Sequence, residues 1–318
     1  PPGGRLRKGK VLARDDLAAL AGAGLTTVTV ARLEDGDIDE DSAALQLAQA
    51  LVPDPTGAGL RLQAVGTGRV NILAEGPGVA RIDAGKVHAV NACDAAITLA
   101  TVPEWTRMEP GGMVATVKII TYALPGAAMA QACIAGHGAL SLCAPVLRSA
   151  SLIQTSVGAE ADGAKGQRVI GARLERLGVT LGPQTVVAHD EDALTGALTR
   201  AEGELLLILT GSATSDSRDV APNALRRAGG VVAHFGMPVD PGNLLFIGEL
   251  GGRAVVGLPG CARSPALNGA DWVMERLICG VDVTGAEIMR MGVGGLLKEI
   301  PSRPRPRTLA HKPAATEG

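Results

Sequence analysis

Small polar residues and two aspartates follow the most apolar run of the chain, and they are the clearest candidates for ligand chemistry. The run Glu204–Thr210 reads ELLLILT, as expected for a strand that is buried on both faces of a sheet. The loop that follows, Thr210–Asp219, reads TGSATSDSRD and precedes a predicted helix. Its backbone N–H groups and hydroxyls could bind phosphate oxygens. Thr210, Gly211 and Ser212 are therefore candidate phosphate ligands.

The two aspartates of this loop have a second possible role. Asp216 and Asp219 could hold a divalent cation that neutralises a bound phosphate. The alternative for Asp219 is purely structural, as the N-cap of the next helix. Asp190, which follows another strand, has the same pair of interpretations. The loop contains no Walker lysine, so it is not a P-loop.

Two further loops join predicted elements at what should be the same sheet edge. Met237–Asn243 (MPVDPGN) is predicted to be a turn because of its Pro-Gly pair, and Gly257–Pro265 (GLPGCARSP) joins a strand to a helix. Ser264 is expected to cap that helix, with Pro265 in its first turn. The candidate ligand-binding residues in these loops are Pro241, Gly242, Asn243, Gly257, Pro259, Gly260 and Ser264.

The elements that position these loops alternate regularly from about residue 149. Strands are predicted at Leu152–Thr155, Thr185–Ala188, Glu204–Thr210 and Gly230–Phe235, and a hairpin at Leu244–Gly248 and Arg253–Gly257. Helices are predicted at Arg168–Leu177, Glu191–Ala201, after Asp219, and from Pro265 to about Cys279. This alternation indicates a three-layer α/β/α domain with a largely parallel sheet, and ligands bind beyond the carboxyl ends of such strands.

The N-terminal half is less regular and is expected to be α+β. Asp15–Gly24 is predicted to be a helix and Thr26–Ala31 (TTVTVA) a strand. The acids of Glu34–Asp41 imitate a calcium loop but lack its glycine and its final glutamate. Asp41 is instead expected to cap a helix that runs to Leu51.

Composition narrows the class of protein. The chain has 318 residues, a net charge of -2, and only two Trp, two Phe and one Tyr. Nucleic-acid binding relies on basic surfaces and aromatic stacking, so nucleic acid is not an expected partner. The five cysteines form no C-x-x-C pair, and no apolar run reaches the ~18 residues of a membrane helix. A cytoplasmic protein without membrane contact is expected.

The three loops resemble, in this order, the molybdopterin-binding domain of molybdenum cofactor biosynthesis proteins, the MoeA/MogA/gephyrin group. That family has a TGG-type loop ending in aspartate, a Pro-Gly-Lys-Pro turn, and GLPG-N-P-x-x-S. The matching positions are Thr210-Gly211 with Asp219, Pro241-Gly242, and Gly257-Leu258-Pro259-Gly260 with Ser264. The resemblance covers roughly residues 149–280. More weakly, Gly9–Ala31 resembles a MoeA-type segment that precedes that domain.

The chain departs from the family pattern at several positions. Ser212 replaces the second glycine of the first loop, and Asn243 stands in a turn that has no lysine. Cys261 and Ala262 replace Asn-Pro in the third motif. The family's lysines would balance molybdate or phosphate charge. Their loss argues against molybdate insertion and leaves pterin binding in place.

The resemblance implies binding of molybdopterin, or its nucleotide form, in molybdenum cofactor biosynthesis. For an enzyme, it implies Mg²⁺-dependent nucleotidyl transfer with ATP or CTP, or metal insertion. Asp219 and Asp216 would then be catalytic, and Asp219 the metal ligand. The alternative is a non-catalytic carrier that serves a nucleotidyltransferase or a molybdoenzyme apoprotein. Self-association is also implied.

The expected organisation has four parts. Residues 1–60 would be a MoeA-like segment and 61–148 an α+β accessory region. Residues 149–297 would form the molybdopterin-binding domain. The Pro/Arg-rich residues 298–318 would be a linker or disordered tail, because the chain resembles bacterial proteins in which a nucleotidyltransferase domain follows.

Overall fold

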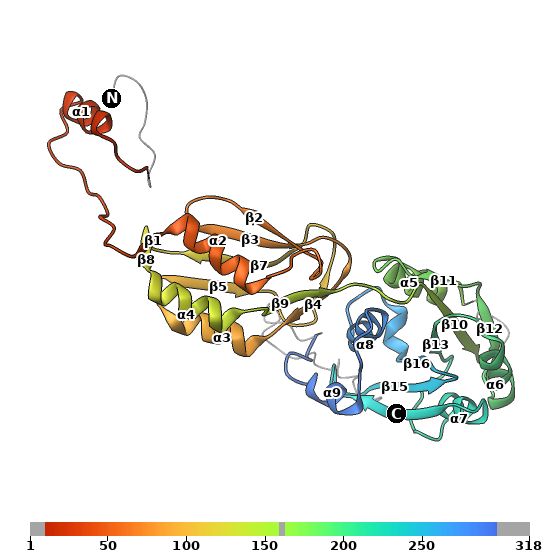
Figure 1. Cartoon of the computed structure of the whole chain (residues 1–318). Coiled ribbons are helices and arrows are strands. Elements are labelled where there is room, and N and C mark those ends of the chain that lie inside the picture. The colour runs from red at the N-terminus through yellow and green to blue at the C-terminus, as the bar shows by residue number, and fades with distance from the viewer. Residues whose placement is uncertain (1–9, 159–162, 298–318) are drawn as a thin grey trace, which may run out of the picture. The chain divides into compact units, whose positions relative to one another are not determined.

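The computed structural model describes residues 10–158 and 163–297, in two compact units, Pro1–Ala144 and Pro145–Gly318 (Figure 1). The predicted tail, 298–318, lies outside the described residues. All five cysteines are free thiols. Within the described part of the chain, no helix has both the length and the apolar character needed to cross a membrane.

The first unit is α+β, as predicted. Its helices are α1 (Arg14–Gly22), α2 (Glu40–Leu51), α3 (Ala84–Cys93) and α4 (Gly126–Gly136). Its strands are β1 (Asp37–Asp39), β2 (Leu60–Ala64), β3 (Arg69–Ala74), β4 (Gly78–Ile82), β5 (Ile97–Thr101), β6 (Arg107–Met108), β7 (Met113–Ile119), β8 (Ala123–Pro125) and β9 (Leu140–Cys143). They form antiparallel sheets in the orders β2-β3-β7-β5, β6-β4-β9 and β1-β8.

One hydrophobic core holds this unit together. Its buried residues extend from Ala43 on α2 to Leu142 on β9, so the core spans the boundary that the sequence suggested between residues 60 and 61. Two local predictions were wrong. The cap of α2 is Asp39, which accepts the N–H groups of Asp41 and Ser42. Thr26–Ala31 is exposed and forms no strand, because its alternating valines have no neighbouring strand to pair with.

The second unit contains the expected α/β domain. Its helices are α5 (Ala164–Glu175), α6 (Glu191–Arg200), α7 (Val220–Arg227), α8 (Gly269–Ile278) and α9 (Gly285–Arg290), with a 3-10 turn, η1, at Gly260–Arg263. Its strands are β10 (Ser149–Ser156), β11 (Thr180–Leu181), β12 (Thr185–Ala188), β13 (Leu205–Leu209), β14 (Val231–Met237), β15 (Asn243–Leu250) and β16 (Arg253–Leu258). The sheet order is β11-β10-β13-β16-β15-β14, and β12 also pairs with β10.

Parallel pairing dominates the sheet, as predicted. β10 pairs in parallel with β11, β12 and β13, and β13 pairs in parallel with β16. The hairpin β15–β16 and the pair β14–β15 are antiparallel. Because β15 is the one strand of this path that runs against its neighbours, the turn between β14 and β15 lies at the edge where the parallel strands end.

Helices cover both faces of this sheet, and the central strand shows why. All five residues of β13 are buried, and Leu206 and Ile208 share a core with Leu194 of α6 and Leu225 of α7. The alternate residues of β13 point to the opposite face. There α5 approaches so closely that a Cβ at Gly166 would lie 3.0 Å from Leu209 Cδ2. The domain is therefore the three-layer α/β/α fold that the alternation predicted.

Candidate functional site

A pocket of about 440 Å³ lies at the edge of the sheet where the parallel strands end. β13 and β16 end there side by side, with Leu209 paired to Leu258. Asn243, the first residue of the antiparallel β15, lies at the same edge. The lining comes from three loops and consists of Thr210–Thr214, Asp240–Leu244, Leu258–Cys261 and Arg263.

The pocket gathers most of the residues that the sequence analysis selected. Those that line it are Thr210, Gly211, Ser212, Pro241, Gly242, Asn243, Pro259 and Gly260. Those that do not line it are Asp216, Asp219, Gly257 and Ser264. The three loops thus meet around one cavity, and the roles assigned to their residues stay predictions.

The first loop is shaped by hydrogen bonds to its own backbone. Buried Thr210 donates its hydroxyl to the Ser212 carbonyl, with 2.6 Å between the oxygens. The Gly211 N–H donates to the Thr155 hydroxyl at 2.9 Å. A Cβ at Gly211 would lie 2.6 Å from the Thr155 carbonyl oxygen, so the neighbouring strand β10 requires glycine here. Thr155 also bonds His189 Nδ1 at 2.8 Å, which ties this loop to the segment after β12.

The two loop aspartates fold back onto the loop. Asp219 occupies the N-cap position of α7, yet its side chain makes no cap hydrogen bond and instead accepts the Ser215 N–H at 2.8 Å. Asp216 accepts the Arg218 N–H at 2.7 Å. Among the described residues, no group of three His, Cys, Asp or Glu side chains could hold a metal.

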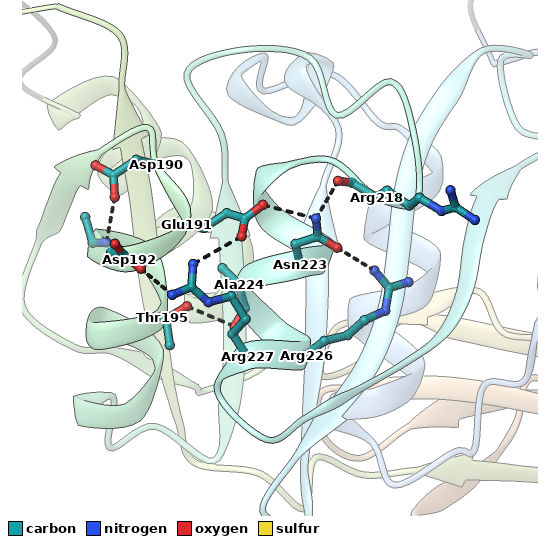
Figure 2. Close-up of polar contacts among 10 residues, drawn as sticks. Asp190, Glu191, Asp192, Thr195, Arg218, Asn223, Ala224, Arg226 and Arg227 are labelled. Atoms are coloured by element: carbon teal, nitrogen blue, oxygen red, sulfur yellow. Dashed lines mark hydrogen bonds and ion pairs between the residues drawn. The ribbon is translucent and has the colours of Figure 1, made fainter.

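The start of α7 is held by a polar network with α6 instead (Figure 2). Asn223 donates to the Arg218 carbonyl at 2.7 Å and to Glu191 at 3.1 Å. Arg227 also bonds Glu191, at 3.2 Å. Asp190 accepts the Ala193 N–H at 2.8 Å and so caps α6, which is its structural interpretation.

The turn between β14 and β15 places two polar side chains at the pocket. Asp240 has a left-handed backbone with φ 45°, a conformation that Asp tolerates better than most residues. Asn243 is 6% exposed, and its Oδ1 accepts the Leu245 N–H at 3.1 Å. Its side-chain nitrogen is buried without a hydrogen-bond partner among the described residues. Asn243 is thus a lining residue of the pocket that carries a buried, unsatisfied donor.

The third loop shows a packing reason for Gly257 and corrects the prediction made for Ser264. Gly257 lies beneath the ring of Phe246, its cross-strand partner, so that a Cβ there would collide with the ring. Its glycine is thus explained by packing within the sheet. Ser264 does not cap the last helix, which begins at Gly269 with Asn268 as its N-cap. The turn η1 and an exposed segment, Ser264–Leu267, occupy the residues between.

Two arginines that the sequence analysis did not select organise this loop. Arg263 lines the pocket and donates to the Thr210 carbonyl at 2.7 Å, and burial lowers the pKa of its guanidinium. Arg173 on α5 forms a buried ion pair with Asp271 on α8. Arg173 also donates to three carbonyls of the loop, those of Ala262, Ser264 and Ala266.

The two arginines differ in whether the sequence could have revealed them. Arg263 lies inside the motif segment, so a search of that loop for charged residues would have found it. Arg173 carries no local signal, because its partner Asp271 is 98 residues away in the chain.

Comparison with known proteins gives a family match within this unit. Residues 164–277 match the family described as "Probable molybdopterin binding domain". The MoeA molybdopterin biosynthesis protein from Pyrococcus horikosii is similar with a TM-score of 0.33 and 16% identity, over 76% of this chain and 79% of that one. Molybdenum cofactor biosynthesis protein B gives 0.33 and 16%, over 43% of this chain and 96% of that one. No curated protein matches the chain.

Proposed function

We propose that the pocket at the sheet edge binds molybdopterin or its nucleotide form, because residues 164–277 match the family model described as "Probable molybdopterin binding domain". The observation that supports this most directly is the convergence of three loops on one cavity of about 440 Å³. That volume lies within the range of ordinary small-molecule sites. All of its lining residues fall within the matched segment.

The pocket offers complementary groups to the two ends of such a ligand. The carboxylate of Asp240 and the amide of Asn243 would hydrogen-bond the polar edge of the pterin, since together they supply acceptors and donors. Gly211 and Ser212 would lie along the phosphate, where the absence of bulky side chains permits close approach of the backbone. Pro259 and Gly260 would form the opposite wall.

A binding titration with a steric variant tests this proposal. A side chain at Gly260 would enter open space, since a Cβ there meets no atom within 4 Å. Gly260→Leu should therefore narrow the pocket without disturbing the fold, and isothermal titration with molybdopterin should show weakened binding. Gly22→Leu on α1 is the matched control, because a Cβ there also meets nothing within 4 Å. Undetectable binding by the wild-type chain, or equal binding by both variants, would refute the proposal.

The proposal extends to catalysis, in which the site would bind Mg²⁺ together with the ligand phosphate. Mg²⁺ is commonly held by one or two carboxylates together with substrate phosphates. Asp219, with Asp216, would supply those carboxylates, because each keeps one oxygen without a hydrogen bond among the described residues. Asp219→Asn should then abolish any stimulation of binding by Mg²⁺. Mg²⁺-independent binding in the wild type would remove this role.

The alternative is a carrier that holds the cofactor for a nucleotidyltransferase or a molybdoenzyme. It is favoured by the position of Asp216 and Asp219 outside the pocket lining and by the turn that lacks lysine. Incubation of the chain with molybdopterin and MgATP or MgCTP discriminates the two. Pyrophosphate release would exclude a pure carrier. Self-association, a nucleotidyltransferase partner and a cytoplasmic location stay predictions.

A further inference from the structure

The guanidinium of Arg263 is a half-buried cation. Most of its N–H donors have no hydrogen-bond partner among the described residues. It makes one hydrogen bond, to the Thr210 carbonyl, although arginine carries five N–H donors. Among the residues that the structure describes, it makes no ion pair. Burial lowers the pKa of this group, which means that its charged form is disfavoured where it lies.

Two other arginines of the second unit, Arg173 and Arg227, each have the carboxylate partner that Arg263 lacks among the described residues. Arg173 is more deeply buried than Arg263, and it is paired with the carboxylate of Asp271. Arg227 is half exposed and still pairs with Glu191. A buried charge without a counter-ion is unfavourable, so proteins rarely keep one in the absence of a partner or a ligand. Arg263 faces the pocket rather than a carboxylate, and the pocket is where its counter-ion should bind.

We propose that Arg263 binds the phosphate group of the ligand, an inference that rests on the proposed function of this pocket. A guanidinium suits this task because its planar array of N–H donors can bind two oxygens of a phosphate at once. Arg263 would thereby supply, from η1, the positive charge that the turn Asp240–Asn243 does not contain.

A second donor in the lining supports an acceptor-rich ligand. The side-chain nitrogen of Asn243 has no acceptor among the described residues, and the bond from the Leu245 N–H fixes which end of the amide is the oxygen. Asn243 and Arg263 come from different loops, yet both are lining residues with N–H groups that lack acceptors among the described residues. A ligand with acceptors at both ends, the pterin edge for Asn243 and the phosphate for Arg263, would satisfy both groups.

Arg173 on α5 and Asp271 on α8 hold the loop that carries Arg263 in place. Arg173 donates to the carbonyls of Ala262 and Ser264, the two neighbours of Arg263, at 3.0 and 2.7 Å. Asp271 holds the Arg173 guanidinium in place. Arg173 therefore holds the backbone on both sides of Arg263.

The test compares Arg263→Gln, Arg263→Lys and the wild type, with two probes. The probes are molybdopterin, followed by calorimetry, and inorganic phosphate, followed by thermal shift. Loss of a hydrogen-bonded charge should weaken binding of each probe roughly 10- to 100-fold in Arg263→Gln. Arg263→Lys should recover part of this loss, because it restores the charge without the planar donor array.

Arg253→Gln is the matched control. Arg253 likewise donates to main-chain carbonyls, those of Ala201 and Gly203, but it does not line the pocket. It should bind both probes as the wild type does. Equal binding of molybdopterin by wild type and Arg263→Gln would overturn the inference while leaving the proposed function intact.

The phosphate probe shows whether the anion site exists even if the proposed function is wrong. If phosphate binding depends on Arg263 and molybdopterin does not bind, the anion site stands and the proposed function fails. If the wild type binds neither probe, both proposals are overturned.

Discussion

Replacing Arg173 by methionine should destabilise the second unit and loosen the wall of its pocket. The methionine would fill much of the same space but could not pair with Asp271 or donate to the loop carbonyls. The loop Gly260–Leu267 would then lose its only described attachment to α5 that involves a charged group. The perturbation acts on one side chain and should be felt in both stability and binding.

The magnitude follows from the burial of the pair. The side chains of Arg173 and Asp271 are 9% and 8% exposed, and removing one partner of such a buried pair costs about 3–5 kcal/mol. Asp271 would keep one hydrogen bond, from the Asn268 N–H at 2.9 Å, which favours the lower end of that range. Ala262 is fully buried, so its carbonyl would lose a partner that water cannot easily replace. We expect a loss of about 3–4 kcal/mol in the free energy of unfolding.

Urea unfolding followed by tryptophan fluorescence can measure this loss. The chain has two tryptophans, and Trp272 lies beside Asp271 on α8. A Trp105→Phe background leaves Trp272 as the sole reporter, so the signal follows the second unit. The surface pair of Arg227 with Glu191 provides the control, because its side chains are 51% and 35% exposed. Arg227→Met should change the free energy of unfolding far less than Arg173→Met does, because solvent screens an exposed pair.

A double variant separates the ion pair from simple packing. Arg173→Met with Asp271→Leu removes both charges, and it should be more stable than Arg173→Met alone because no buried carboxylate is left unpaired. The reasoning fails if Arg173→Met unfolds at the wild-type urea concentration. It also fails if the double variant is less stable than the single one.

Three further predictions concern other parts of the second unit. Gly257→Ala should destabilise the second unit by about 1–3 kcal/mol, because the new methyl group would collide with the ring of Phe246. Adding Phe246→Leu to this variant should restore part of the lost stability, and thermal unfolding of the single and the double variant measures the difference. Hydrogen bonds from the Arg148 and Ser149 backbone and the Ser149 hydroxyl lower the pKa of Glu204. The Glu204 carboxylate therefore contributes its full stabilisation of the fold above the ordinary Glu pKa of about 4.3, and this contribution is lost as the pH falls through the lowered value. Glu204→Gln should therefore be less stable than wild type at pH 7, and the difference should disappear in acid. Cys261 lines the pocket, so molybdopterin should slow its alkylation by iodoacetamide, with half-buried Cys93 as an internal reference whose rate stays constant.

The sequence by itself predicted most elements of the α/β domain in their correct order, although it missed the two-residue strand β11 and the short helix α9. Thr185–Ala188 is a strand with the predicted bounds, and the apolar run after Glu204 is the fully buried β13. These signals are local, because a strand covered on both faces must be apolar along its length. Turn residues such as Gly242, with φ 95°, are likewise dictated by local backbone geometry.

Local signals failed where the deciding partner is distant or absent. Thr26–Ala31 has a strand-like composition, but a strand exists only when another strand pairs with it. Asp39 and Asp41 are equally good caps by type, and only the structure shows that Asp41 accepts the Gly68 N–H instead. In the same way, Ser264 was predicted to be the N-cap of the last helix, but Asn268 has the position and the hydrogen-bond partners of that cap.

The sequence therefore determined the fold class and the three loops, because strand burial and turn geometry are properties of short segments. The tertiary structure decided which side chains of those loops face the cavity. It placed Gly257 beneath Phe246 and folded Asp219 onto its own loop. It also brought Arg263 to the Thr210 carbonyl, 53 residues away in the chain. Contacts over such separations depend on how the strands are ordered in the sheet, and no short segment of the sequence encodes that order.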